Sequence, residues 1–430
     1  MTRLMLDEII DPSEARVVVT RDAAGRVTDA RFDMTGLPRV DSMLVGRPVA
    51  EVPALVEHLC GICPAAHHLA GIRAVEALWG VRPPVAAQFQ RRLLNAGSVL
   101  SGHAMSLLIA STSQTDGKAQ TDQATQDAMT LRRFAKATMA AAGSPGHFPA
   151  TAIPGGVAAP VSPEARARCQ DLLDDALAAA LRIAHQATKD GDAGPGFPGA
   201  DVALVDEDGH PDLSGEYLRA VAPDGATIIP SATADAWDQL IAEAVPGDPA
   251  PRPYLIALGP EHGTYRVGPV AQLKVGPLRT PLAAGLQQTW LRTYEENPQT
   301  ARAIVTLYAV ETIGDLLARP ELLGSDIATP LPERWRAGTG VGWVDGSRGL
   351  LVHRYAADEA GRVTSATILT PTAQNERWLA HLLRLAVDTS DAQIGAEEAI
   401  READPCLPCV TAPPGRMGLV IDTVFNQEGR

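Results

Sequence analysis

The chain has 430 residues, of which 45% are hydrophobic, so it can bury a large core. Its 37 basic and 51 acidic residues give a net charge of −14, which repels phosphate backbones and anionic membranes and excludes nucleic acid as an expected partner. No apolar run approaches the about 18 residues of a membrane span, and acidic residues interrupt the N-terminal segment, so we expect neither a span nor a secretory signal. The five cysteines form no disulfide framework, which favours the cytoplasm.

The N-terminal part of the chain predicts a hairpin followed by a helix. Residues 15–33 alternate apolar and polar side chains on both sides of a turn at Asp22–Gly25, which is typical of a β-hairpin. A helix is expected over residues 64–80, because Pro64 suits the first helical position and Gly80 suits the end. Cys63 then occupies the N-cap, where the helix dipole favours a thiolate.

Apolar residues at helical spacing dominate the middle of the chain and predict a bundle of long helices. Residues 190–275 are richer in glycine, proline and short strand-like runs, so we expect a mixed insertion there. A second hairpin is expected over residues 351–368, and we expect both hairpins to be peripheral and to belong to one small sheet. The sequence thus predicts a mostly α fold with small β-sheets, in a single interleaved domain over residues 1–430. The predicted helical stretches are 85–113, 124–142, 162–188, 278–319 and 373–401.

Two cysteine pairs with CxxC spacing lie at opposite ends of the chain, at Cys60–Cys63 and Cys406–Cys409. If the fold brings the two pairs together, four thiolates can hold a metal. A structural zinc site also uses four thiolates, but its pairs normally lie about 15–20 residues apart. A thioredoxin-like site needs one pair in a βαβ unit, whereas the first pair here opens a helix. Two buried disulfides would suit a secreted protein, which this chain does not resemble.

The surroundings of both pairs resemble a known family. Residues 57–70, EHLCGICPAAHHLA, are similar to the first metal-binding motif of the large subunit of nickel-iron hydrogenases, and residues 404–409, DPCLPC, are similar to the last. The cytoplasmic NAD(P)-linked or bidirectional group is the most similar. The resemblance implies a long-helix bundle with terminal hairpins. Five further matches follow in the family's order, at residues 46–48, 154–157, 265–269, 347–351 and 370–375.

The resemblance implies a nickel-iron centre and assigns its ligands. Cys60 and Cys406 would be terminal nickel ligands, while Cys63 and Cys409 would bridge nickel to an iron that carries carbon monoxide and cyanide. This chemistry agrees with the residue types. Splitting H2 into a proton and a hydride requires a soft, redox-active metal with an open coordination position, and thiolates select such metals over magnesium or calcium.

The same resemblance gives roles to residues near the expected centre. By itself, Arg348 would be a solvated arginine in a glycine-rich turn, and the hydroxyl of Thr372 after Pro371 would be a turn or cap group. In the family pattern, Arg348 and its neighbour Ser347 lie over the metals, where a guanidinium can hold a cyanide nitrogen or orient a substrate base. Thr372, with Pro371, matches the residue that hydrogen-bonds the second cyanide.

A histidine and an aspartate adjoin the two cysteine pairs. His67 lies one helical turn after Cys63, so its ring is expected to reach that sulfur. Asp404 places an acid beside a metal thiolate, and we expect Arg348 or another cation to balance its charge. His68 is expected to be an ordinary core or surface residue.

The chain also departs from the family pattern. The glutamate that accepts the first proton in most members is absent from its position, and Glu14 or Glu57 is a candidate substitute; we place Glu14 in the catalytic set. The acidic magnesium ligand corresponds to Asp41. The histidine or arginine at which the family's C-terminal peptide is cleaved is Ala412 here, so we expect the tail 413–430 to be retained.

Two functions follow from these observations. The first is a catalytic hydrogenase subunit that oxidises H2 reversibly. It would pass electrons to an iron-sulfur small subunit, then to NAD(P)- and flavin-binding diaphorase subunits, because this chain has no spare cysteines for a cluster. The second is an H2 sensor or non-catalytic assembly subunit that keeps the fold but has low turnover. The four thiolates and Arg348 favour the enzyme.

Overall fold

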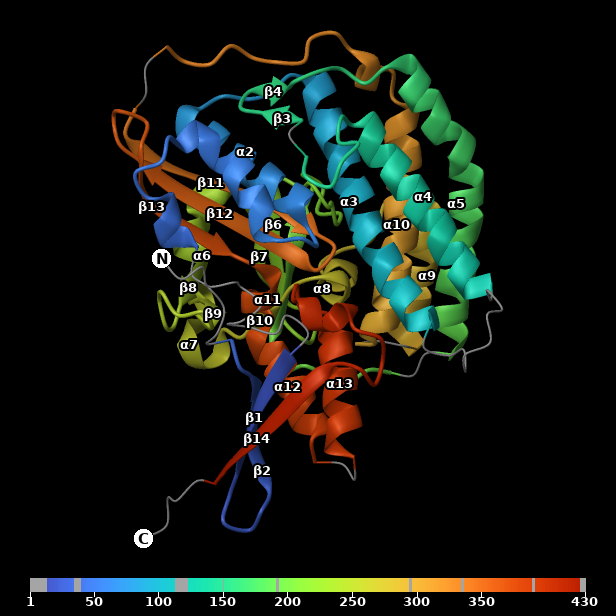
Figure 1. The fold of residues 1–430 in the computed structure, drawn as a ribbon, viewed down its shortest axis with the longest axis vertical. Helices are drawn as coiled ribbons and strands as arrows, with labels where there is room; N and C mark the ends of the chain where they lie inside the picture. The colour runs from blue at the N-terminus through green and yellow to red at the C-terminus, as the bar shows by residue number, and fades with distance from the viewer. Residues whose placement is uncertain are drawn as a thin grey trace, which may run out of the picture.

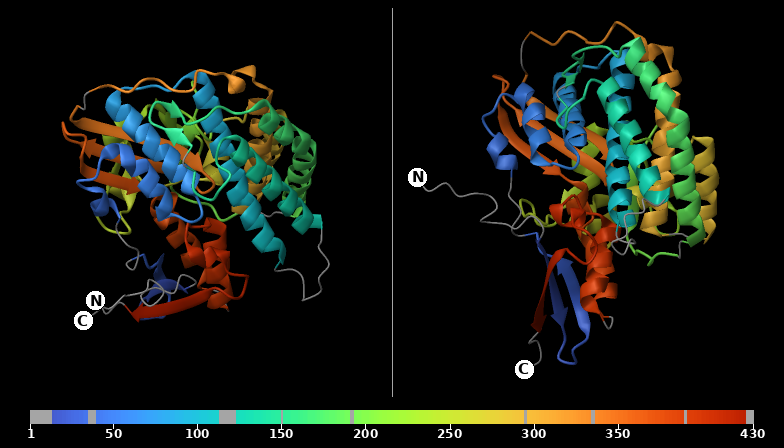
Figure 2. Two further views of the ribbon diagram at one scale, coloured as in Figure 1. Left: turned by 45° about the horizontal axis from the view of Figure 1, so that its top comes forward. Right: turned by 45° about the vertical axis from the view of Figure 1, so that its right-hand side comes forward.

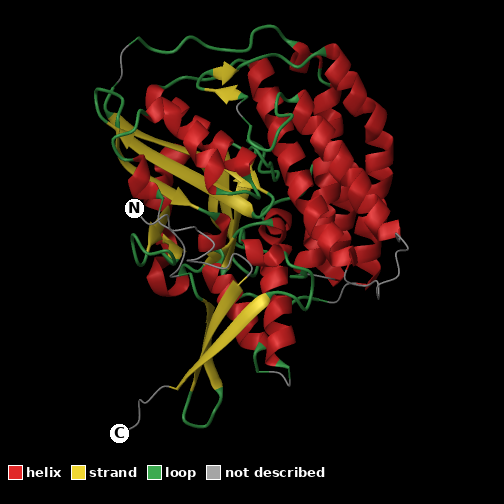
Figure 3. Ribbon diagram, in the orientation of Figure 1, coloured by secondary structure: helices red, strands yellow, loops and turns green. Residues whose placement is uncertain are grey.

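The computed structural model describes residues 14–34, 40–112, 123–149, 151–190, 193–293, 296–333, 336–388 and 391–425. Most of the long helices lie side by side on one side of the molecule, and the strands form small separate sheets beside and below them (Figures 1 and 3). The prediction of a mostly α fold with small sheets is confirmed.

The bundle is built from the helices that the apolar periodicity predicted. Helix α3 packs against α4 and α10, and α5 packs against the same two helices. The predicted stretch 278–319 is divided, because the side chain of Asn297 caps a new helix by accepting a hydrogen bond from Thr300 N, and Pro298 starts it. The long helices are α2 (Pro64–Trp79), α3 (Val85–Thr112), α4 (Gln123–Ala141), α5 (Pro163–Asp190), α9 (Pro281–Thr293) and α10 (Pro298–Ala318).

One helix in the described part of the chain, Val85–Ala110 within α3, is long and apolar enough to cross a membrane by length and composition alone. Within the fold, 56% of its apolar window is buried. Because α3 contacts α4 and α10, this burial is that of a core helix.

Helix α2 lies directly on a three-stranded antiparallel sheet of β11 (Gly338–Gly346), β12 (Gly349–Ala357) and β13 (Val363–Leu369). Two glycines of β11 permit this close approach. A Cβ atom at Gly340 would lie 2.1 Å from Ala74 O, and one at Gly342 would lie 2.2 Å from Ala74 N. The sheet therefore sets the position of α2 and of the cysteine pair at its N-terminus.

The terminal segments form a separate three-stranded sheet that extends away from the bundle (Figures 1 and 2). Strand β1 (Glu14–Arg21) pairs with β2 (Val27–Phe32) in the predicted hairpin, and β14 (Gly418–Phe425) runs parallel to β1. Helices α12 (Glu376–Ala386) and α13 (Ala392–Ala403) pack together, and α12 covers β2.

The expectation that the two hairpins share one sheet is wrong. The free edge of β1 is taken by β14, while β12 of the second hairpin pairs with β11. The second hairpin is also not peripheral, because most of β12 is buried beneath α2.

The segment between α5 and α9 has the mixed character that its composition suggests. A four-stranded sheet has the order β10-β5-β6-β7, with β8 and β9 as a separate pair. Its elements are β5 (Ala200–Val205), β6 (Tyr217–Val221), β7 (Thr227–Ala232), α6 (Trp237–Leu240), β8 (Ile241–Glu243), β9 (Pro253–Leu255), α7 (Gly259–His262), β10 (Tyr265–Arg266) and α8 (Pro269–Lys274). The other short elements are α1 (Val52–Val56), β3 (Ala152–Ile153), β4 (Gly156–Val157), α11 (Pro371–Gln374) and 3-10 helices at Asp41–Leu44, Val49–Glu51, Glu57–Leu59, Ala234–Ala236, Ile256–Leu258, Pro320–Leu323 and Pro408–Thr411.

Candidate metal centre

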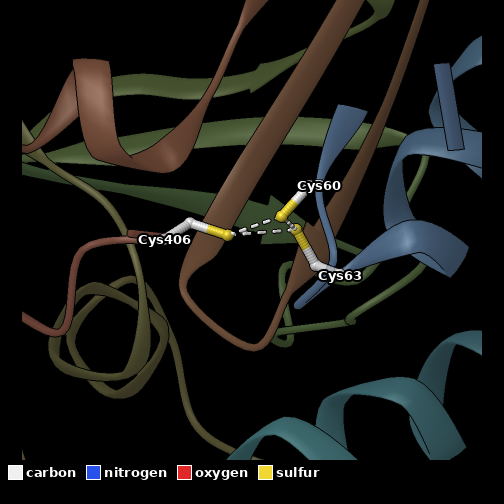
Figure 4. A group of neighbouring side chains, drawn as sticks. All are labelled: Cys60, Cys63 and Cys406. Carbon is white, nitrogen blue, oxygen red and sulfur yellow. Dashed lines mark hydrogen bonds between the residues drawn. The ribbon is translucent and has the colours of Figure 1, made fainter. Parts of the chain in front are cut away.

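Three cysteine sulfurs from the two ends of the chain meet in the interior (Figure 4). The Sγ atom of Cys60 lies 2.9 Å from that of Cys406 and 3.3 Å from that of Cys63, and the Cys63 and Cys406 sulfurs are 3.4 Å apart. Pro64 starts α2 directly after Cys63, and the side chain of Cys63 makes no cap hydrogen bond, so its sulfur is available to a ligand. We call these three residues the sulfur triad.

The triad cannot carry three negative charges without a cation. Hydrogen bonds from Cys406 and Cys63 lower the pKa of Cys60. The hydrogen bond to Cys406, followed by that to Cys60 and by burial, raises the pKa of Cys63. The pKa of Cys406 is raised to about 12, chiefly by its hydrogen bond to Cys60. A soft cation would replace the shared protons and stabilise all three thiolates.

Cys409, the fourth predicted ligand, lies outside the triad. Its side chain is buried among the apolar residues that join α12 and α13 to the terminal sheet, and burial raises its thiol pKa to about 11. The 3-10 helix Pro408–Thr411 directs it there. The structure therefore brings together three of the four predicted sulfurs. Cys169 is buried in α5, in the bundle core, as expected.

Arg348 is buried next to the triad and pairs with Asp404, as the sequence predicted. Its Nη2 donates to Asp404 Oδ1 at 2.9 Å, its Nε to Asp404 O at 3.1 Å, and its Nη1 to Ser347 Oγ at 3.2 Å. Burial acts to lower the pKa of Arg348, but the charge of Asp404, followed by Cys406 and Cys63, raises it. A second guanidinium, that of Arg302, lies 3.5 Å from Asp404 Oδ2.

The turn that carries Arg348 is held by a close backbone contact. A Cβ atom at Gly268 would lie 2.8 Å from Arg348 O, and one at Gly349 would lie 2.4 Å from Gly268 N. Both glycines have positive φ, 104° and 115°. The residues 265–269 thus support the arginine turn from behind, which their sequence did not reveal.

Thr372 connects α11 to the second cysteine pair. Its hydroxyl oxygen accepts a hydrogen bond from Cys406 N at 2.7 Å, while Thr370 caps α11 by accepting from Ala373 N. Pro371 and Thr372 line a cavity of about 490 Å³ with the triad. Thr370, and not Thr372, is therefore the residue that caps α11.

His67 lies beside Cys60, and its side chain lines the same cavity as both Cys60 and Cys63. A hydrogen bond from its side chain contributes to the lowered pKa of Cys60. Its Nδ1 lies 3.0 Å from Nε2 of His353, whose own Nδ1 contacts the hydroxyl of Tyr355. His353 and Tyr355 were not among the residues that the sequence predicted for the site. The signal in the sequence was two polar aromatic residues at alternate positions of β12, on a face whose other residues, Gly349, Leu351 and Ala357, are not polar.

His68 has a structural role, as expected. Its Nε2 contacts Ala152 O at 2.9 Å, its Nδ1 lies 3.0 Å from Glu57 Oε2, and burial lowers its pKa to about 4. Burial raises the pKa of the Glu57 carboxyl to about 7.

The candidate acids lie in different surroundings. Glu14 begins β1, opposite Gly418 in the terminal sheet. Asp41 begins a 3-10 helix and lines the same cavity as the sulfur triad. Glu57 belongs to the short 3-10 helix that leads into Cys60.

The carboxyl of Asp345, three residues before Arg348, is buried, and the pH dependence of protein stability tests how strongly this burial affects its pKa. It is fully buried, its Oδ2 accepts a hydrogen bond from Leu204 N at 2.9 Å, and burial raises its carboxyl pKa from 3.8 to about 7. Because the folded pKa is the higher one, this group makes the protein less stable as pH rises from about 4 to 7, by about 1.4 kcal/mol per pH unit.

We expect Asp345→Asn to remove this loss, so that its unfolding free energy falls less than that of the wild type between pH 5 and pH 8. Urea unfolding at the two pH values measures the difference. Asp208→Asn, which changes an exposed carboxylate, is the control and should behave as the wild type. Equal pH dependence in wild type and Asp345→Asn would contradict the assignment.

Comparison with known sequences places the chain among hydrogenases. A family model described as nickel-dependent hydrogenase matches residues 39–108. One relative, from the F420-non-reducing hydrogenase vhu of Methanococcus voltae, is 30% identical over 84% of this chain and 92% of its own length. The NAD-reducing hydrogenase HoxS subunit beta of Cupriavidus necator is 29% identical, over 98% of each chain.

Solved structures show the same fold. A chain of an NAD+-reducing [NiFe]-hydrogenase in the H2-reduced state matches with a TM-score of 0.80 and 28% identity, over 91% of this chain and 95% of that one. The Ni-Fe-Se hydrogenase of D. vulgaris Hildenborough has a TM-score of 0.69 at 18% identity, over 90% of this chain and 95% of that one.

Proposed function

The chain belongs to the nickel-dependent hydrogenases, and on that premise we propose that it is the catalytic large subunit of an enzyme that oxidises H2 reversibly. The observation that carries the proposal is the sulfur triad. Residues more than 340 positions apart in sequence place their sulfurs 2.9 Å and 3.4 Å from one another.

The residues at the site fit a nickel-iron centre. Thiolates select soft, redox-active metals, and Cys60, Cys63 and Cys406 supply three sulfur ligands, of which Cys63 is buried and the other two are partly buried. We propose Cys409 as the fourth ligand, and because it lies outside the triad, the segment Pro408–Thr411 must rearrange when metal binds. Asp41 is the proposed magnesium ligand, which is supported by its position on the shared cavity.

When bound, such a centre, with carbon monoxide and cyanide on its iron, supplies the open coordination position at which H2 is cleaved. The protein supplies the surroundings. Arg348 brings a positive charge that Asp404 balances, so its guanidinium is held in one orientation. The hydroxyl group of Thr372 fixes the backbone of Cys406.

Two glutamates are candidates for the first proton acceptor. Glu14 is the nearest acid to the position of the family's glutamate. Glu57 is favoured by its pKa, which burial raises to about 7, because such a carboxyl exchanges protons readily near neutral pH. The exposed His58, whose Nε2 lies 3.7 Å from Glu57 Oε1, connects this carboxyl to the surface.

Electrons must leave through partner subunits. An iron-sulfur cluster is held by cysteine thiolates, and Cys169 is the only cysteine outside the two CxxC pairs. We therefore propose an iron-sulfur small subunit together with diaphorase subunits that bind NAD(P) and flavin, the latter from the likeness to an NAD-reducing relative. All five cysteines are free, which supports a cytoplasmic location.

A second function is favoured by the departures from the family pattern. A hydrogenase-like H2 sensor or assembly subunit needs the fold and the metals but little turnover. The absent proton-accepting glutamate and the separation of Cys409 from the triad support this alternative.

One preparation tests both functions. The chain is co-produced with its small subunit, and nickel and iron content, infrared absorption and H2-dependent dye reduction are measured. Bound carbon monoxide and cyanide with rapid dye reduction are expected for the enzyme. The same bands with slow turnover would favour the sensor, and absence of nickel and of the bands would overturn both.

We propose that the C-terminal tail is retained as part of one interleaved domain. Along its whole length β14 pairs with β1, Ala412 O accepts a hydrogen bond from Arg401 at 2.8 Å, and Gly415 N donates to Glu397 at 2.7 Å. Pro413 and Pro414 also stiffen the segment that a protease would have to bend.

Intact-mass spectrometry of the nickel-loaded protein is expected to show the full chain through Arg430. Retention is favoured because removal would expose the edge of β1 and the apolar residues beneath it. A species that ends near Ala412 would contradict the proposal.

A further inference from the structure

We infer that His103 is a positioning residue that fixes the turn carrying Arg348, by donating a hydrogen bond from its ring Nε2 to the backbone carbonyl of Ser347. His103 lies on α3, and its Nε2 is 2.9 Å from Ser347 O. This inference deepens the proposed function and rests on it for the chemical purpose of Arg348. Its geometry comes from hydrogen bonds between groups that lie outside the sulfur triad.

The turn consists of two residues between paired strand ends. Gly346 of β11 pairs with Gly349 of β12, so Ser347 and Arg348 form the whole loop. The carbonyl of Ser347 belongs to the peptide group that joins it to Arg348, and a peptide group is planar. Holding this oxygen therefore fixes the direction in which the chain enters Arg348. The exposed fractions of the two turn residues are 5% and 8%, so little water reaches them.

Helix α3 also contacts the side chain of Ser347. A Cβ atom at Gly102 would lie 2.6 Å from both Cβ and Oγ of Ser347, so glycine lets the helix approach the turn. The same Oγ accepts a hydrogen bond from Arg348 Nη1 at 3.2 Å. Gly102 and His103 thus hold Ser347 at its side chain and at its carbonyl, and Ser347 in turn contacts the guanidinium.

The direction of the histidine contact follows from the chemistry of its partner. A carbonyl oxygen has no proton and can only accept, so Nε2 of His103 carries the proton and donates it, whatever the charge of the cysteines. In a neutral ring Nδ1 is then bare, and it lies 3.1 Å from the hydroxyl of Thr306 on α10. That hydroxyl has one proton and a second acceptor in reach, Arg302 O at 2.7 Å. Because a bare nitrogen only accepts, Thr306 supplies the proton of its contact with the ring.

A neutral donor suits the charges around the turn. His103 is 1% exposed, and burial, followed by the charge of Arg302, lowers its pKa to about 3, so the ring is uncharged near neutral pH. Arg302 and Arg348 both lie against Asp404, at 3.5 Å and 2.9 Å. A third cation would repel these guanidinium groups and compete for the carboxylate, whereas a neutral imidazole holds the turn without doing so.

The turn is held from two sides. Helix α3 contacts it at Ser347, and the close approach of Gly268 supports it at Arg348 O. A buried carbonyl that loses its donor is costly to leave unpaired, so removal of the His103 ring is expected to let the Ser347 peptide group rotate toward another partner. The guanidinium would then lose its fixed position relative to Ser347 Oγ and Asp404.

The first test is nitrogen-15 NMR of the histidine-labelled, metal-free full-length chain, because bare and protonated ring nitrogens have distinct chemical shifts. The signals of His103 are those that His103→Gln removes. We expect one neutral form with the proton on Nε2. A bare Nε2 would overturn the inference, and this result does not require a variant without the donor to fold.

The second test follows the Nε–H signal of Arg348 in the arginine-labelled chain, assigned by its absence in Arg348→Lys. His103→Leu removes the donor, whereas His103→Gln keeps an amide N–H that can replace ring Nε2–H. We expect His103→Leu to shift the signal and to speed its exchange with water, and His103→Gln to return both toward the wild type.

The matched control is Gln90→Leu. Gln90 also lies on α3, and its buried amide donates to Ala142 O at 3.1 Å and Ala159 O at 3.0 Å, away from the turn. The control is expected to lower stability without moving the Arg348 signal. An Arg348 signal that His103→Leu leaves unchanged, or that Gln90→Leu moves equally, would overturn the inference.

The metal-loaded complex separates this inference from the proposed function. His103→Leu is expected to retain nickel and to lower the rate of H2 oxidation about tenfold, as loss of a residue behind a metal site commonly does. Equal rates in wild type and His103→Leu would overturn the inference and leave the function standing. If the wild-type complex does not oxidise H2 but the Arg348 signal responds as expected, the positioning role stands and the catalytic function falls.

Discussion

Replacing Cys406 by serine is expected to leave the purified protein with sub-stoichiometric nickel and no measurable H2 oxidation. Cys406 supplies the sulfur 2.9 Å from that of Cys60 and is the member of the triad that comes from the C-terminal part of the chain. A serine hydroxyl is a harder ligand and keeps its proton near neutral pH, so it neither replaces the soft donor nor balances the metal charge. Nickel content is measured by metal analysis.

The matched control is Cys169→Ala. This cysteine is buried in the bundle core, away from the triad, so its replacement changes packing without removing a proposed ligand. The control should retain nickel in full. A full nickel complement in Cys406→Ser would reject its role as a ligand, whatever the activity of that variant.

Replacing Arg348 by lysine is expected to preserve folding and nickel content but to lower the rate of H2 oxidation at least about tenfold, which corresponds to about 1.4 kcal/mol. The guanidinium makes three directed contacts, two to Asp404 and one to Ser347. An ammonium group cannot reproduce this planar arrangement, so the charge remains but its orientation near the metals is lost. Dye reduction under H2 measures the rate.

Arg354→Lys serves as the control for the same chemical change. Arg354 lies on β12 and pairs at the surface with Asp238, and surface ion pairs contribute little. Its rate should match the wild type. If Arg348→Lys were fully active, the fixed orientation of the guanidinium would be unnecessary for the reaction.

The sequence alone predicted the features that depend on neighbouring residues. Pro64 and Gly80 set the limits of α2, and the apolar periodicity predicted α3, α4 and α5 to within a few residues. The pairing of Arg348 with Asp404 was also predictable, because a buried acid beside thiolates requires a cation.

The sequence did not predict which strands pair. The first hairpin was expected to join the second in one sheet, but its strand β1 pairs with β14 from the far end of the chain. Strand pairing between distant segments depends on which edges the fold leaves open, and no local pattern records this.

The chain by itself determined the metal-binding residue types, their spacing and the long helices, because these depend on contacts within a few residues. Only the tertiary structure decided which sulfurs meet and what supports them. Cys409 shares the spacing of Cys63, yet a single 3-10 turn and the packing of α12 and α13 direct it into a different core. His353 reaches His67 across 286 residues of sequence, and Tyr355 contacts His353, because α2 packs on β12; side chains at such separation become neighbours only through packing.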